Sequence, residues 1–172
     1  MSDNGPEPGL GSTGGLRGAK GQLYEGGIRS PLIVWSSGIP AEKRGATNSK
    51  TVLAAMDLPP SLLAITQNPE RANHAFDGRD MHNALMGSEM TRDAPVMWVR
   101  PPDRPGPKNA WPDLAIRDGQ WKLLVHRDGS RAELYDIDAD PNESNNLAAK
   151  LPDVARGMSD RVIGWDRSIH PR

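Results

Sequence analysis

The clearest hydrophobic pattern lies in the second half of the chain, where short apolar runs are separated by turn residues. Asp118-Gly119 and Asp128-Gly129 each stand between two such runs, and an Asp-Gly pair in that position is typical of a β-hairpin. The pattern predicts a strand over 94–99 and an antiparallel meander with strands over 114–117, 120–126 and 131–137. A closing amphipathic helix is predicted over 151–166, with inward positions at Leu151, Val154, Met158, Val162 and Trp165.

The first half of the chain contains one continuous apolar run, Leu32-Ile33-Val34-Trp35, which is bounded by Pro31 and by Ser36-Ser37-Gly38. A short run of this kind with β-branched residues is typical of a strand buried on both faces. We therefore predict a buried strand over 31–35. Such a strand needs neighbours, and few upstream residues can provide them.

Prolines and glycines delimit short helices farther along the chain. Pro59-Pro60 predicts that one segment ends near Asp57 and that a second helix begins with proline in its first turn. Its inward residues are predicted to be Leu62, Leu63 and Ile65. A brief helix is predicted over 81–86, ending at Gly87, and a proline-rich linker over 101–112.

Composition narrows the classes of partner. The chain has 172 residues, a net charge of -1 and no cysteine. A nearly neutral chain has no general field that favours nucleic acid or an anionic membrane, so we expect neither as a partner. The absence of cysteine excludes a disulfide, a thiolate metal site and a cysteine nucleophile from these residues.

Two short polar motifs near the N-terminus carry candidate chemistry. Asp3-Asn4 presents a carboxylate beside an amide carbonyl, and Ca²⁺ and Mg²⁺ prefer such hard oxygen donors. Asp-Asn-Gly is also common simply as a turn. Lys20 lies in Gly18-Ala19-Lys20-Gly21, where small neighbours would let an oxyanion approach the ammonium; the alternative is a flexible surface loop.

Seven segments carry longer motifs: SDNGP at 2–6, LRGAKG at 16–21, YEGGIRSP at 24–31, MDLPPSLL at 56–63, FDGRD at 76–80, AIRDGQWKL at 115–123 and ELYDIDADPNESNNL at 133–147. In this order they resemble the late active-site signature and the C-terminal sheet of the sulfatase family, within the alkaline-phosphatase-like superfamily. Ser61 stands where the family pattern has threonine.

The resemblance implies an α/β fold. Residues 1–90 would form the C-terminal part of an alkaline-phosphatase-like α/β sandwich, and residues 91–172 a small antiparallel β-sheet subdomain with a C-terminal helix. It also implies that Asp3 and Asn4 are Ca²⁺ ligands, with Mg²⁺ as the alternative ion. Lys20 would bind the sulfate group of the substrate as a catalytic residue, whereas Glu25 and Arg29 would be structural.

The family nucleophile has no match in this chain. Family members use a formylglycine made from Cys or Ser in a Cys/Ser-x-Pro/Ala-x-Arg motif, and no serine here begins that pattern. We therefore expect a C-terminal fragment of a sulfuric ester hydrolase that is inactive alone, with the formylglycine upstream and the missing N-terminal half as a partner. The substrate would be a sulfated small molecule or sulfated carbohydrate.

Two alternatives stay open. The same metal and lysine would serve a phosphonate monoester or phosphodiester hydrolase of the superfamily. A non-catalytic remnant acting as a binding module would also fit the missing nucleophile. Family members are typically periplasmic, secreted or lysosomal, although residues 1–9 lack the basic and apolar regions of a signal peptide.

Overall fold

The computed structural model describes residues 2–68, 74–100 and 111–170, which fall into two compact units. One unit joins residues 1–32 to residues 95–172, and the other contains residues 33–94. The break near residue 94 lies close to the predicted boundary between residues 90 and 91. The glycine-rich residues 1–32, however, pack with the C-terminal unit rather than with residues 33–90. Most of the predicted linker over 101–112 lies outside the described residues.

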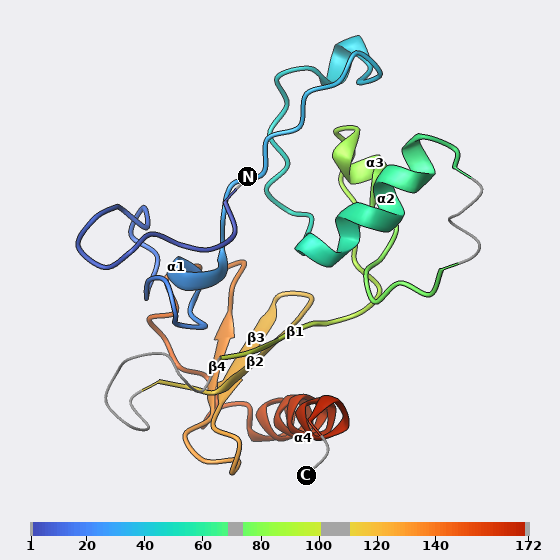
Figure 1. Cartoon of the computed structure of the whole chain (residues 1–172). Helices are drawn as coiled ribbons and strands as arrows, with labels where there is room; N and C mark the ends of the chain where they lie inside the picture. The colour runs from blue at the N-terminus through green and yellow to red at the C-terminus, as the bar shows by residue number, and fades with distance from the viewer. Residues whose placement is uncertain (1, 69–73, 101–110, 171–172) are drawn as a thin grey trace. The chain divides into compact units, whose positions relative to one another are not determined.

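The first unit is built on a four-stranded antiparallel sheet in the order β1-β2-β3-β4, shown in Figure 1. Its strands are β1 (Val96–Val99), β2 (Leu114–Asp118), β3 (Trp121–Val125) and β4 (Glu133–Asp136). Gly119 and Gly129 turn the chain with φ of 57° and 83°, a conformation that glycine adopts without steric cost. The predicted strand, meander and antiparallel subdomain are confirmed.

Side chains alternate between the two faces of this sheet, as strand geometry requires. Helix α4 (Pro152–Ile169) covers one face of the sheet, as Figure 1 shows. Its residues Met158 and Val162 are buried there. The predicted inward positions of the helix are confirmed, because Leu151, Val154 and Trp165 also pack against that core. The opposite face carries Ala115, Leu124 and Tyr135, and it is covered by Leu23 and Tyr24. The N-terminal segment is therefore held against the sheet.

The second unit contains short helices: η1 (Ala41–Lys43), η2 (Ala55–Asp57), α2 (Leu58–Ile65) and α3 (His82–Leu85). Proline lies in the first turn of α2 and Gly87 follows α3 with φ of 90°, both as predicted. The predicted inward positions of α2 are partly wrong. Leu62 and Ile65 are exposed, and the buried positions of this helix are Pro60 and Ser61.

The prediction of a buried strand over 31–35 is wrong. Residues 31–35 form neither helix nor strand, and Ile33 and Trp35 are 86% and 89% exposed. The physical reason is a lack of neighbours, because every strand within the described residues pairs inside the β1–β4 sheet. An apolar run can be buried as a strand only when other strands flank it.

A buried carboxylate joins two of the sequence motifs in the second unit. Asp57 accepts hydrogen bonds from the backbone N–H groups of Ala54 (2.8 Å) and Arg79 (2.7 Å), and it pairs with the buried Arg92 guanidinium. Ser61 Oγ accepts the N–H of Met81 at 2.8 Å. The residues of MDLPPSLL and FDGRD therefore bind each other, and they define the fold of this unit.

We predict that Asp57→Ala destabilises the second unit strongly. The change leaves the buried Arg92 without its counter-ion, and breaking a buried ion pair costs about 3–5 kcal/mol. Circular dichroism during urea unfolding should show a lower midpoint. The matched control is Asp93→Ala, because the Asp93 side chain is 80% exposed and its ion pair is with the exposed Arg79. Equal midpoints for the two variants would contradict this role of Asp57.

Candidate functional site

The motif SDNGP at residues 2–6 packs on a short helix, α1 (Glu25–Ile28), and the two backbones are in very close contact. The N–H of Gly5 donates to Gly27 O at 2.9 Å, and the N–H of Lys20 donates to Pro6 O at 3.0 Å. A Cβ added at Gly5 would lie 1.8 Å from Gly26 O, so only glycine permits this approach. These contacts hold Asn4-Gly5-Pro6 beside the backbone of Lys20.

A buried ion cluster fixes α1 to the sheet. Lys122 of β3 is completely buried, and its Nζ lies 2.9 Å from Glu25 Oε1 and 2.8 Å from Glu143 Oε1. Glu143 Oε2 also accepts the backbone N–H of Glu25 at 2.7 Å. One ammonium thus lies between two carboxylates, one on α1 and the other after β4. Burial raises the pKa of Glu143, and the ion pair with Lys122 opposes that rise.

Arg17 provides a second connection between the N-terminal segment and the sheet. Its guanidinium donates to Tyr135 Oη at 2.7 Å, to Tyr24 Oη at 3.0 Å and to the backbone carbonyl of Glu143 at 3.1 Å. The guanidinium carbon also lies 3.9 Å from the centre of the Tyr24 ring, a cation–π distance. Because these partners come from the segment before α1, from β4 and from the turn after β4, Arg17 holds all three together.

The motif ELYDIDADPNESNNL builds the turn that delivers Glu143. Asp140 accepts the N–H groups of Ser144 and Asn145 at 2.9 and 2.8 Å. Asn146 Oδ1 accepts the N–H of Leu134 at 3.0 Å. Glu143 itself has φ of 54°, which is uncommon outside glycine. The side-chain bonds around it therefore hold a backbone conformation that directs its carboxylate to Lys122.

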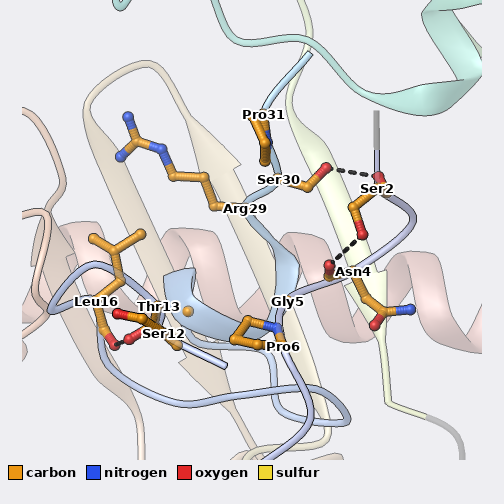
Figure 2. Close-up of a pocket in the computed structure, with 11 residues that line it drawn as sticks. Ser2, Asn4, Gly5, Pro6, Ser12, Thr13, Leu16, Arg29, Ser30 and Pro31 are labelled. Atoms are coloured by element: carbon orange, nitrogen blue, oxygen red, sulfur yellow. Dashed lines mark hydrogen bonds between the residues drawn. The ribbon is translucent and has the colours of Figure 1, made fainter. Parts of the chain in front are cut away.

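An open depression of about 590 Å³ lies beside α1 and includes one of the predicted site residues. Ser30 Oγ donates to Ser2 O at 2.7 Å, and Ser2 Oγ donates to Asn4 O at 3.0 Å. Figure 2 shows these two bonds on one side and the Arg29 guanidinium on the other. Polar side chains, glycines and prolines line the depression together with the apolar Leu16; the lining residues are Ser2, Asn4, Gly5, Pro6, Ser12, Thr13, Leu16, Gly26, Arg29, Ser30 and Pro31.

The three predicted site residues lie in one loop region but differ in their surroundings. Asn4 is half-buried and lines the depression, whereas Asp3 is exposed and does not line it. The Lys20 side chain is 35% exposed, and its Nζ lies 3.4 Å from Glu7 Oε2. Hydrogen bonding places the Lys20 backbone beside residues 4–6. That Asp3 and Asn4 bind a cation while Lys20 binds an anion at the same site stays a prediction.

The donor set offers only part of a calcium site. Asp3 and Asn4 supply hard oxygen atoms, which suit Ca²⁺, but this ion takes 6–8 oxygen ligands. Across the residues with described positions, no group of three or more His, Cys, Asp or Glu side chains could hold a metal ion. Backbone carbonyls, side-chain amides and water are the other oxygen donors that Ca²⁺ accepts.

Sequence reasoning assigned structural roles to Glu25 and Arg29 but missed Lys122, Glu143 and Arg17. Glu25 is buried in the ion cluster, as a structural role requires. Arg29 Nη1 lies 3.8 Å from Glu25 Oε2, and its side chain is 46% exposed. A lysine inside an otherwise apolar strand was the available signal for Lys122, since a lysine is fully buried almost only when paired.

Comparisons with known proteins find similarity to sulfatases. A family model described as Sulfatase matches residues 1–68. N-acetylgalactosamine-6-O-sulfatase of Bacteroides thetaiotaomicron is 31% identical over 159 residues, which cover 84% of this chain and 28% of that protein. Human arylsulfatase A is 29% identical over 187 residues, covering 91% and 35%.

A solved sulfatase structure gives the same result at the level of the fold. It comes from work on the metabolism of multiple glycosaminoglycans by Bacteroides thetaiotaomicron, and it has a TM-score of 0.59 at 25% sequence identity. The match covers 92% of this chain and 32% of that chain. The chain thus spans about a third or less of the length of these relatives.

No helix within the described ranges is long and apolar enough to cross a membrane.

We predict that Lys122→Met destabilises the chain by about 3–5 kcal/mol at neutral pH, because it leaves the buried Glu143 carboxylate without its counter-ion and removes the nearest cation from Glu25. The deficit should shrink on acidification. Burial already raises the pKa of Glu143, and loss of Lys122 raises it further. A carboxyl group whose pKa is higher in the folded state favours folding below its unfolded pKa of about 4.3, and this contribution disappears as the pH rises through the folded pKa.

Urea unfolding at pH 5 and pH 8 measures this effect. The double variant Lys122→Met/Glu143→Gln should regain part of the lost stability at pH 8, because it removes the unpaired charge of Glu143. Lys150→Met, at an exposed position, is the control. A deficit for Lys122→Met that is the same at both pH values, with no recovery in the double variant, would contradict the buried cluster.

Proposed function

This chain belongs to the sulfatase family, and we propose that it supplies the metal-binding and sulfate-binding loop of a sulfuric ester hydrolase. The observation that carries the proposal is the backbone fixation of Asn4-Gly5-Pro6 on α1, directly beside Lys20. Sulfate esters of carbohydrates are the proposed substrate class. This choice is supported by the name of the N-acetylgalactosamine-6-O-sulfatase relative.

In this proposal Lys20 donates to the sulfate oxygens of the substrate. Its present partner, Glu7, has a side chain that is 55% exposed, and an exposed ion pair of this kind contributes only about 0–1 kcal/mol. A substrate sulfate can therefore displace the Glu7 carboxylate at little cost. The ammonium then stabilises the negative charge on the sulfate oxygens while the ester bond breaks, as preorganised cationic groups do in other active sites.

Asp3 and Asn4 would hold Ca²⁺, with Mg²⁺ as the alternative, through carboxylate and amide oxygens. A bound divalent ion supplies Lewis-acid polarisation of the sulfate oxygens. The hydrogen bond from Gly5 N–H to Gly27 O restricts the position of the neighbouring Asn4. The formylglycine nucleophile would come from residues outside this chain, so residues 1–172 alone should not hydrolyse sulfate esters. The expected compartment is periplasmic, secreted or lysosomal.

The role of Lys20 can be tested in a chimera. Residues 1–172 would replace the matched region of the N-acetylgalactosamine-6-O-sulfatase of Bacteroides thetaiotaomicron, and release of sulfate from a 6-sulfated N-acetylgalactosamine would be measured. Lys20→Ala should lower kcat/KM by about 100-fold or more, the scale of losing one preorganised donor. The control is Lys50→Ala, whose side chain is 74% exposed and pairs with Glu89.

Equal activity of the Lys20→Ala and Lys50→Ala chimeras would contradict the role of Lys20. Faster turnover of an aryl phosphonate than of an aryl sulfate by the active chimera would assign the site to phosphonate ester hydrolysis instead. An active chimera is required for either conclusion. An inactive, folded chimera would contradict the proposal that this chain supplies a working sulfatase loop.

The metal role is tested by binding. We predict that Asp3→Ala weakens Ca²⁺ binding to the chimera, because calcium affinity follows the number and charge of its ligands. Isothermal titration calorimetry with CaCl₂ should show at least a tenfold weaker Kd, about 1.4 kcal/mol. Asp153→Ala is the control, since the Asp153 side chain is 94% exposed on α4. An unchanged Kd in Asp3→Ala would remove Asp3 from the metal site.

A further inference from the structure

Asn4-Gly5 is the only Asn-Gly pair in the chain. Asparagine is one of the thermolabile residues of proteins, because the peptide nitrogen of the following residue can attack its side-chain amide carbon. A following glycine favours this attack, since it has no Cβ to hinder the approach and adopts backbone conformations that other residues avoid. Residue 4 can therefore undergo a covalent change that the proposed function does not use.

The reaction needs only water besides the chain itself. Gly5 N loses its proton and forms a bond to Asn4 Cγ, while the bond from Cγ to Nδ2 breaks and ammonia leaves. Water then opens the resulting succinimide ring at either of its carbonyl groups. The products are an aspartate at position 4 or an isoaspartate, in which the main chain runs through the former side chain. Both products add a negative charge beside Asp3.

The structure places the two reacting groups in different surroundings. The N–H of Gly5 donates to Gly27 O at 2.9 Å, and Gly5 is buried so tightly that an added Cβ would lie 1.8 Å from Gly26 O. Asn4 is half-buried and lines the open depression of Figure 2. Its side-chain amide makes no hydrogen bond to any residue whose position is described. Water can thus reach Asn4, whereas the attacking nitrogen is held by α1.

We propose that Asn4-Gly5 is a protected deamidation site, in which the hydrogen bond from Gly5 N–H to Gly27 O keeps Asn4 intact. The reaction proceeds only from the fraction of molecules in which this contact has opened, so its rate follows the local opening equilibrium. The isoaspartate product lengthens the backbone directly before Gly5. Because Gly5 already lies against the α1 backbone without room for a Cβ, this product cannot restore the contact. Deamidation therefore releases the loop irreversibly.

The buried ion cluster controls this opening. Glu25, the first residue of α1, lies 2.9 Å from Lys122 Nζ, and its backbone N–H donates to Glu143 Oε2 at 2.7 Å. Gly27 belongs to the same short helix, so a change that loosens Glu25 also weakens the bond that protects Gly5. The lifetime of Asn4 therefore depends on a charge cluster on the sheet.

The test compares the full chain in buffer with the same chain unfolded in urea, at equal pH and temperature. Peptide mass spectrometry follows the conversion of Asn4, and an isoaspartate methyltransferase assay detects the isoaspartate product. Asn4 should convert at least about tenfold more slowly in the folded chain, which corresponds to about 1.4 kcal/mol of opening free energy. Asn48 is the comparison within the chain. It precedes Ser49 rather than glycine, so it should convert more slowly than Asn4 in urea.

Hydrogen exchange at the Gly5 N–H measures the opening independently, because exchange and deamidation both require that its bond to Gly27 O be broken. The protection factors from the two methods should agree in the unaltered chain. Lys122→Met should raise both rates by about tenfold or more, the effect of losing about 1.4 kcal/mol at α1. Lys150→Met, at an exposed position, should change neither rate. The agreement in the unaltered chain does not depend on the folding of these variants.

Three outcomes would overturn the proposal. Equal conversion rates of Asn4 in the folded and unfolded chain would show that the bond gives no protection. Slow conversion in a folded chain whose Gly5 N–H exchanges freely would assign the protection to another cause. Faster conversion of Asn48 than of Asn4 in urea would show that Asn4-Gly5 is not the labile pair. These measurements use neither calcium nor a sulfate ester, so their result is separate from that of the proposed function.

Discussion

The ammonium group of Lys122 lies between two buried carboxylates that come from distant parts of the chain. Glu25 contributes one from α1, and Glu143 contributes the other from the turn after β4. A buried charge is tolerated only when it is well paired, so the fold must keep α1, β3 and that turn together. The position of the N-terminal loop follows from this constraint, since the backbone of residue 5 is bonded to α1.

This constraint links sheet packing to chemistry. Alternation along β3 directs Lys122 to the face opposite α4, and Tyr24 and Leu23 cover that same face. The loop with Asp3, Asn4 and Lys20 is consequently attached through α1 to the sheet. The Asp3 carboxylate and the Lys20 ammonium stay accessible. Sites supported by rigid elements hold their groups in better-defined positions than free loops do. Arg17 strengthens the same attachment through Tyr24, Tyr135 and the turn at Glu143.

Local patterns predicted the elements well, and long-range pairing explains what they missed. Asp118-Gly119 and Asp128-Gly129 determine their hairpins within a few residues, so the meander was predictable. Lys122 was not, because its burial depends on Glu25, 97 residues away in the sequence. The inward face of α2 was mispredicted because Ser61, a polar residue, is buried by its bond to Met81. Residues 31–35 have the composition of a strand, but composition does not supply neighbours.

The most direct test of the account is a crystal structure of the active chimera with Ca²⁺ and a non-hydrolysable sulfated sugar. We expect anomalous density for one calcium ion contacted by Asp3 and Asn4. We also expect that Lys20 Nζ has left Glu7 and donates to a sulfate oxygen, with the Lys122 cluster unchanged. A calcium ion bound elsewhere, with Lys20 still paired to Glu7 and distant from the sulfate, would contradict it.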